Sequence, residues 1–155
     1  MTLKADRHPI SLGSPFERVY GYSRAYVCGD EVVIAGTTGY DYAKMTIPDD
    51  VAEQTRNIYA TFAEVMKEAG GELADIVRLR TFVTDAADCE PVLEVQGEVF
   101  GAIRPAATIV VVSALFKPEM KVEIEAEARL GRRVVRRPRL APAGSMSSRR
   151  RFLDP

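Results

Sequence analysis

The hydrophobic pattern of the chain predicts strands and two helices in the order β-β-α-β-α-β-β. Residues 49–71 repeat apolar side chains at spacings of three and four, the period of an amphipathic helix, and residues 88–101 carry a shorter stripe of the same kind. Alternating or continuous apolar runs predict strands in the remaining segments: 22–39 (a hairpin), 75–85, 106–115 and 121–130. We expect a short turn around Pro118 to join the last two strands.

Local signals support these boundaries. Asp50 followed by Glu53 resembles a capping box at the start of the longer helix, and Gly70-Gly71 is a stop signal at its end. Gly29-Asp30 is a turn pair between two strand-like runs, as a hairpin requires.

The order of elements predicts an α+β fold with a mixed sheet. Both helices follow strands in β-α-β steps, so they should pack on one face of the sheet. Residues 108–112 are β-branched on both sides of their strand, which calls for burial on both faces. Two helices cover only one face, so we expect other subunits to cover the second.

The last strand alternates strictly between apolar residues and glutamates. The apolar set should face the helices, and Glu123, Glu125 and Glu127 should face the expected partner subunit. Arg78 and Arg80 alternate on a neighbouring strand, and we expect them to neutralise Glu125 and Glu127.

Length and composition indicate one domain. The 155 residues are 46% hydrophobic, which is enough for a single core. No apolar run is long enough to span a membrane, and the N-terminus lacks the pattern of a signal peptide, so we expect a cytoplasmic protein.

Metal and cofactor chemistry have no support in the sequence. Cys28 and Cys89 have no His or Cys companion at ligand spacing, so we interpret them as free thiols. His8 is the single histidine, which disfavours a histidine-based triad. The stretch GTTG at 36–39 lacks the Gly-Lys-Ser/Thr sequence of a phosphate loop.

Charge is distributed unevenly along the chain. Eight of the 21 basic residues but one of the 22 acids follow Gly131, so residues 1–131 carry a net charge of −8. We therefore divide the chain into an N-terminal arm (1–17), a domain (18–131) and a basic tail (132–155). An arginine-rich tail can bind RNA, but the acidic body would repel phosphate, so nucleic-acid binding is disfavoured.

Two features of the sequence could serve either packing or ligand binding. Arg104 precedes the apolar strand either as a surface cation or as a cleft residue that holds an anion. Tyr20, Tyr22 and Tyr26 are spaced by two and four positions, which on one strand would place them on one face. A tyrosine hydroxyl at a cleft would be a hydrogen-bond donor.

Four motifs together resemble one known family. GYSRAYVCGDEVVIAG, DIVRLRTFVTD, RPAATIVVV and VEIEAEA occur in the order and spacing of the Rid (YjgF) reactive intermediate deaminases, also called endoribonuclease L-PSP-like, over about residues 18–130. The resemblance implies a chorismate-mutase-like fold and a homotrimer with a small-molecule ligand in each inter-subunit cleft. It implies hydrolysis of enamines and imines, such as those from 2-aminoacrylate, to 2-keto acids and ammonia without any cofactor.

The resemblance carries over to the site only in part. Tyr22 matches the family's cleft tyrosine, and Glu123 matches the glutamate thought to position water, which makes it our candidate catalytic residue. Ala107 stands where active deaminases have the arginine that binds the substrate carboxylate, and Ala35 stands where a serine precedes Gly36. We expect Gly36, Ala107 and Arg104 to contact the ligand, with Arg104 or Arg80 replacing the missing arginine.

Two functional hypotheses follow. The first is a hydrolytic deaminase of an enamine or imine metabolite with altered specificity, in which Glu123 assists water attack on a polarised C=N bond. The second is a non-catalytic trimer that binds a small carbonyl or apolar ligand, which the differences at Ala107 and Ala35 favour. RNA binding or endoribonuclease-like activity is a weaker third.

Overall fold

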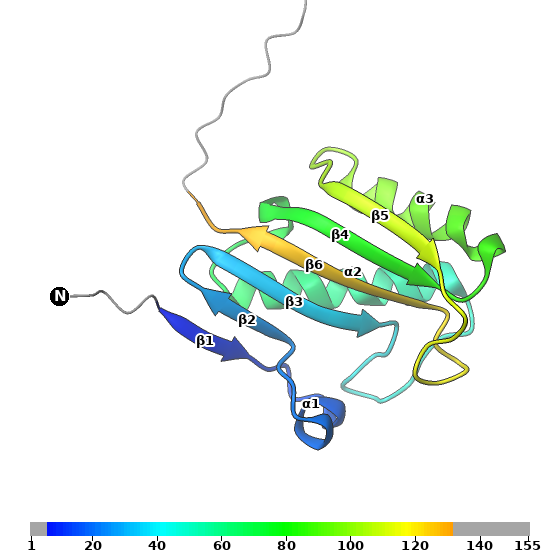
Figure 1. Cartoon of the computed structure of the whole chain (residues 1–155), viewed down its shortest axis with the longest axis horizontal. Helices are drawn as coiled ribbons and strands as arrows, with labels where there is room; N and C mark the ends of the chain where they lie inside the picture. The colour runs from blue at the N-terminus through cyan, green and yellow to red at the C-terminus, as the bar shows by residue number, and fades with distance from the viewer. Residues whose placement is uncertain (1–5, 132–155) are drawn as a thin grey trace, which may run out of the picture.

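A computed structural model describes residues 6–131, which form a six-stranded mixed sheet with two long helices on one face (Figure 1). The strand order is β1-β2-β3-β6-β4-β5. The strands are β1 (Arg7–Ile10), β2 (Ala25–Cys28), β3 (Glu31–Thr38), β4 (Ile76–Val83), β5 (Ala106–Val111) and β6 (Val122–Arg129). The helices are α1 (Pro15–Tyr20), α2 (Val51–Glu68) and α3 (Cys89–Phe100), with short 3-10 turns at Leu73–Asp75 and Ala86–Asp88. No helix in the described range is long and apolar enough to cross a membrane.

The predicted elements are confirmed, with bounds a few residues shorter. β2 and β3 form the expected antiparallel hairpin around Gly29. The Asp50 side chain caps α2 by accepting a hydrogen bond from the Glu53 backbone at 2.8 Å. The sheet is mixed because β4 and β5 run parallel, whereas β6 is antiparallel to both of its neighbours.

The predicted turn around Pro118 is present, where the Met120 N–H donates to the Lys117 carbonyl at 3.0 Å. The two strands that it connects are not neighbours, because β4 lies between β5 and β6.

One sequence prediction is wrong in detail. Tyr20, Tyr22 and Tyr26 do not share a strand. Tyr20 is the last residue of α1, Gly21 reverses the chain with a φ of 70°, and only Tyr26 lies in β2.

The pattern also missed β1 and α1, which lie largely in the expected N-terminal arm. β1 pairs with β2. α1 begins with a full capping box between Ser14 and Glu17, which stabilises a helix of only six residues. The division into arm, domain and tail stays a prediction, and residues 132–155 lie outside the described residues.

The core lies between the sheet and the helices. As predicted, the apolar residues of β6 face the helices, and the glutamates lie on the opposite face. Phe62 and Ile58 of α2 are fully buried against this sheet face, together with Leu79 of β4. Burial of such side chains is the main favourable term in folding.

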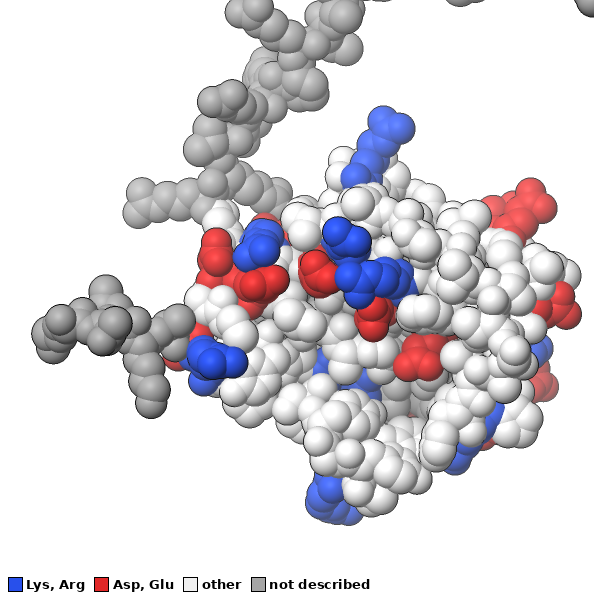
Figure 2. Space-filling view, viewed as in Figure 1, with Lys and Arg blue, Asp and Glu red and all other residues white. Residues whose placement is uncertain are grey.

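The second face of the sheet has no helix over it. Figure 2 shows this face, where charged side chains gather over the middle of the sheet and the surrounding surface is mostly uncharged. Val110 of β5 is 43% exposed on this face, and Val33 of β3 is also exposed there. A single chain therefore leaves apolar residues of two strands in contact with water.

Gly39 sets how closely the end of β3 approaches α2. A Cβ at position 39 would lie 2.6 Å from the Cα of Gln54, which belongs to the helix backbone and cannot turn aside. The Gln54 amide itself bonds the backbone of three loop residues, namely Pro48, Glu119 and Lys121.

We predict that Gly39→Ala lowers the free energy of unfolding by about 1–3 kcal/mol, because the added methyl group overpacks a rigid contact. Gly97→Ala is the matched control. Position 97 is an exposed site in α3 where an added Cβ would meet no other atom within 4 Å, so this change should raise stability by roughly 0.5–1 kcal/mol. Urea unfolding measures both. If Gly39→Ala left the free energy of unfolding unchanged, that result would contradict the close approach of β3 to α2.

Candidate functional site

A bulge interrupts β3 where it pairs with β6. The register shifts between Ile34 and Thr37, so Ala35 and Gly36 together lie opposite Glu125. Bulges of this kind bend a strand and redirect side chains, and they are common beside active sites. The predicted ligand residue Gly36 thus lies at an irregular point of the sheet.

Glu123 of β6 extends across Gly36. A Cβ at position 36 would lie 2.2 Å from Oε1 of Glu123, which no side chain allows. Any residue other than glycine would therefore displace the carboxylate. Because position 36 has no side chain, the Glu123 carboxylate can lie directly over the β3 backbone.

Aromatic side chains surround this carboxylate on the open side. They line a pocket of about 250 Å³ with a few polar groups. The lining residues are Phe16, Tyr20, Tyr22, Gly36, Thr38, Tyr42, Phe116, Met120 and Glu123. The predicted site residues Glu123, Tyr22 and Gly36 are thus brought together in one pocket.

Helix α1 holds one aromatic wall in place. Phe16 stacks on Tyr20 with ring centroids 6.1 Å apart, and Tyr20 meets Phe116 edge-on at 5.5 Å. The buried Glu17 carboxylate fixes both ends of the segment by accepting hydrogen bonds from the Ser14 and Arg24 backbones at 3.0 and 3.1 Å. The capping box that starts α1 therefore also shapes the pocket.

Arg24 lies beneath the pocket and has no exposed surface. Its Nη1 donates to the Gly36 carbonyl at 3.2 Å and to the Thr37 hydroxyl at 2.9 Å. Its Nη2 donates to the Tyr22 hydroxyl at 3.1 Å. The guanidinium carbon also lies 4.7 Å from the ring centroid of Tyr42.

The environment of Glu123 changes its acidity. Burial raises the pKa of this carboxyl above its ordinary value of 4.5, the negative charge of Glu125 raises it further, and the positive charge of Arg24 lowers it. A carboxylate with a raised pKa in an apolar pocket is suited to accepting and returning a proton.

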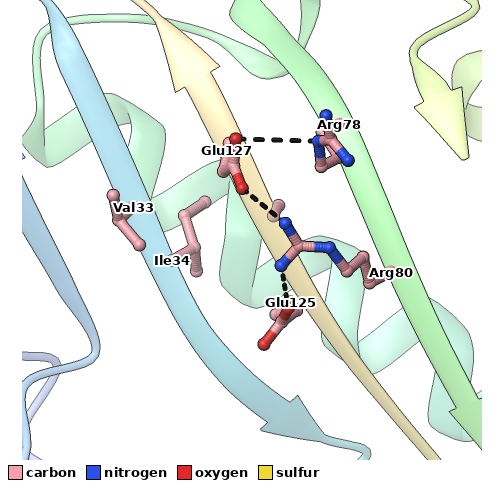
Figure 3. Close-up of a pocket in the computed structure, with 7 residues that line it drawn as sticks. Val33, Ile34, Arg78, Arg80, Glu125 and Glu127 are labelled. Carbon is pink, nitrogen blue, oxygen red and sulfur yellow. Dashed lines mark hydrogen bonds and ion pairs between the residues drawn. The ribbon is translucent and has the colours of Figure 1, made fainter.

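The remaining charges of the open face are paired with each other, as predicted. Arg80 bonds Glu125, and it bonds Glu127 at 2.9 Å, while Nε of Arg78 lies 3.7 Å from Glu127 (Figure 3). These side chains and Val33 and Ile34 line a second, smaller hollow. Arg80 is therefore held in an ion-pair network and is not a free anchor within one chain.

Arg104 and Ala107 do not line the pocket of the same chain. Arg104 is exposed and has a left-handed backbone conformation with a φ of 59°. Its backbone N–H donates a hydrogen bond to the Phe100 carbonyl. Ala107 is exposed on β5, and its partner Leu79 lies on β4. Strand β4 separates β5 from β6, which carries Glu123.

A known family profile matches nearly all of the described chain. Residues 14–130 match the sequence profile of a family described as endoribonuclease L-PSP. The chain belongs to this family, the Rid or YjgF family.

Solved structures and curated sequences agree with this assignment. The Rid chain is similar to Rv2704 of Mycobacterium tuberculosis, a member of the YjgF/YER057c/UK114 family, with 44% identity and a TM-score of 0.74 over 81% of this chain and 100% of the other. It resembles the Rid-family protein YyfA of Yersinia pestis at 26% identity, a TM-score of 0.74 and the same coverage. It is 32% identical to protein SCO2049 of Streptomyces coelicolor over 84% of this chain and 97% of that one. The expected chorismate-mutase-like α+β fold is confirmed.

Sequence reasoning missed most of the pocket of this Rid chain. Arg24 lies within the motif GYSRAYVCGDEVVIAG, but nothing in the pattern marks it as buried. Phe16, Tyr42 and Phe116 come from three loop or short helical segments whose approach has no periodic signal. Within residues 6–131, no three His, Cys, Asp or Glu side chains are placed to hold a metal ion. Cys28 and Cys89 are free thiols.

We predict that Glu123→Gln stabilises the protein at neutral pH but not in acid. The folded state raises the pKa of Glu123, so the folded state binds this proton more tightly than the unfolded state. Its contribution to stability is full below the unfolded pKa and is lost as pH rises through the folded pKa. The neutral amide avoids that loss, so its advantage should grow with pH.

Urea unfolding of the wild type and Glu123→Gln between pH 4 and 8 measures this difference. Glu125→Gln is the matched control, because it removes an ion pair with Arg80 and should cost stability at neutral pH. If the free energies of unfolding of the wild type and Glu123→Gln differed by the same amount at every pH, the raised pKa of Glu123 would be contradicted.

Proposed function

We propose that this Rid protein hydrolyses an imine or enamine metabolite, with Glu123 as the residue that orients and deprotonates the attacking water. The observation that carries the proposal is the Glu123 carboxylate, placed over Gly36 inside an aromatic pocket with a raised pKa. A positioned carboxylate with such a pKa typically accelerates a proton-transfer step by about 10²–10⁴-fold.

The proposed reaction balances without a cofactor. Water forms a C–O bond to the imine carbon while Glu123 accepts a water proton, and the C=N electron pair moves to nitrogen. Glu123 then returns the proton to that nitrogen. The C–N bond then breaks as the carbonyl forms, and the hydroxyl proton passes through Glu123 to the leaving nitrogen, which releases a ketone and ammonia or an amine. An enamine reaches the same path after tautomerisation to the imine.

Specificity must differ from that of the best-known members of the family. Ala107 stands in place of the arginine that binds a substrate carboxylate, and in one chain Arg80 is held by two glutamates. A carboxylate that enters an apolar pocket without a cationic partner loses its hydration at considerable cost. The substrate is therefore an imine other than a simple 2-imino acid.

A second candidate function is ligand binding without turnover. The pocket is lined mainly by aromatic side chains and Met120, which favours binding of an apolar molecule. Nucleic-acid binding is less supported, because residues 1–131 carry a net charge of −8. A cytoplasmic location stays a prediction.

We further propose that the chain forms a homotrimer through the open face of the sheet. The exposed residues Val33 and Val110 lie on this face, where they pair with Glu127 and Phe82, and the family resemblance implies three subunits. In that assembly the 103–107 segment of a neighbouring subunit would complete the cleft, so that Arg104 and Ala107 meet Glu123 across an interface.

Light scattering on the purified chain should give about three times the chain mass of 17.1 kDa. The physical reason is that exposed valines on two strands favour association. A stable monomer at micromolar concentration would contradict both the assembly and the inter-subunit cleft.

We predict weak or no hydrolysis of imines derived from 2-aminoacrylate by the wild type. Ala107→Arg should raise the rate by supplying the missing cation, and Ala35→Ser should raise it further. Glu123→Gln in that background should remove the gain, since an amide accepts no proton from water. The measurement is the initial rate of 2-keto acid release.

The rate in the improved background should rise with pH through the pKa of Glu123. Rapid hydrolysis by the wild type would contradict the missing-anchor account. Arg104→Ala and Arg80→Ala, made separately, would then show which side chain holds the carboxylate. If neither change lowers the rate, this account of carboxylate recognition is wrong.

A further inference from the structure

Arg24 carries a fully buried charge without an anionic partner. Among the described residues, no carboxylate oxygen lies within ion-pair distance of its guanidinium, and its Nε has no hydrogen-bond partner. The neighbouring Glu17 bonds the backbone of Arg24 and not its side chain. A buried charge of this kind is costly unless dipoles compensate it.

Neutral groups of the site supply that compensation. The guanidinium donates to one carbonyl and two hydroxyls, and it lies against the ring faces of Tyr22 and Tyr42, with centroids at 5.4 and 4.7 Å. Such cation–π contacts are stronger when the cation is desolvated. The positive charge thus remains unneutralised directly below the pocket.

This arrangement decides how Tyr22 bonds a ligand. Its hydroxyl accepts a hydrogen bond from Arg24, and within the described residues it donates to no other group. A phenol that accepts one bond keeps its own proton for another acceptor. Because Tyr22 lines the pocket, that proton is available to a ligand. Burial raises the pKa of Tyr22, so the hydroxyl keeps its proton at neutral pH.

The pocket therefore presents the Tyr22 hydroxyl as a donor and, close by, the Glu123 carboxylate as an acceptor inside an aromatic wall. A ligand carboxylate would meet the like charge of Glu123. It would also find no exposed donor on Arg24, because the guanidinium is fully buried beneath the pocket.

We propose that Arg24 is a positioning residue that acts through Tyr22 and Glu123. It makes the pocket select uncharged molecules that carry a carbonyl or imine acceptor beside an apolar or aromatic group. This inference rests on the proposed function for the location of the site, and it names the ligand class of that site. The pocket volume of about 250 Å³ suits it, since a cavity of about 150 Å³ holds a benzene ring.

Binding of two probes of similar size and different charge tests the ligand class. Calorimetric titration of the full chain at neutral pH should show acetophenone binding at least about tenfold tighter than benzoate. Tyr22→Phe should weaken acetophenone binding by about tenfold, because it removes one hydrogen bond. The proposal would be overturned if acetophenone did not bind, or if benzoate bound as tightly or more tightly. It would also be overturned if Tyr22→Phe bound acetophenone as tightly as the wild type.

The role of Arg24 has its own readout. Carbon-13 NMR titration of the Glu123 carboxyl should show its midpoint moving to higher pH in Arg24→Gln, whereas Arg24→Lys, which keeps the charge, should stay near the wild type. A merely structural arginine would leave the midpoint unchanged in a folded Arg24→Gln variant, and that result would overturn the proposal. If Arg24→Gln does not fold, the probe comparison with Tyr22→Phe still decides it.

These experiments require no turnover, so they separate this inference from the proposed function. A protein that prefers acetophenone but hydrolyses no imine would contradict the proposed function and leave the inference in place. A protein that hydrolyses imines but prefers benzoate would do the reverse.

Discussion

The absence of a side chain at position 36 is the constraint on which the pocket depends. Glu123 lies where the β carbon of any other residue would be, and the bulge in β3 brings that backbone position opposite β6. Regular pairing at this point would present a side chain in place of bare backbone. The carboxylate is thus located by sheet geometry, and the aromatic wall from α1 and the loops then encloses it.

Electrostatic balance explains why these groups belong together. Burial and the charge of Glu125 favour the protonated form of Glu123, whereas Arg24 favours the ionised form. The arginine avoids a direct ion pair with the carboxylate, so Glu123 remains available to exchange a proton. A direct ion pair, such as that between Arg80 and Glu127 at 2.9 Å, would instead occupy the carboxylate oxygens with a fixed partner.

Periodicity predicted the scaffold because burial imposes it. The spacing in α2 and the alternation in β6 both follow from packing against one core, and the face of Glu123 followed from the same alternation. The pairing of Arg80 with Glu125 and Glu127 was predictable for a related reason, since neighbouring strands bring alternating charges together.

The rest of the site depends on features without a period. Tyr22 was predicted as a pocket residue by family resemblance, but its place after a left-handed Gly21 rather than on a strand was missed. The burial of Arg24 depends on contacts with the bulge and with two tyrosine rings, which no spacing along the sequence encodes. The sheet order β3-β6-β4-β5 has no signal in the sequence for the same reason, because strand neighbours that are distant in sequence leave no local pattern.

The central claim is that the pocket over Gly36 is where this Rid protein binds its ligand. A crystal structure of the full chain soaked with an aryl ketone, the product class of the proposed reaction, tests it most directly. The account predicts the ketone within the aromatic wall, with its oxygen in hydrogen-bond distance of the Tyr22 hydroxyl and its carbonyl carbon facing Glu123. A ketone bound elsewhere on the protein, with this pocket left without it, would contradict the account.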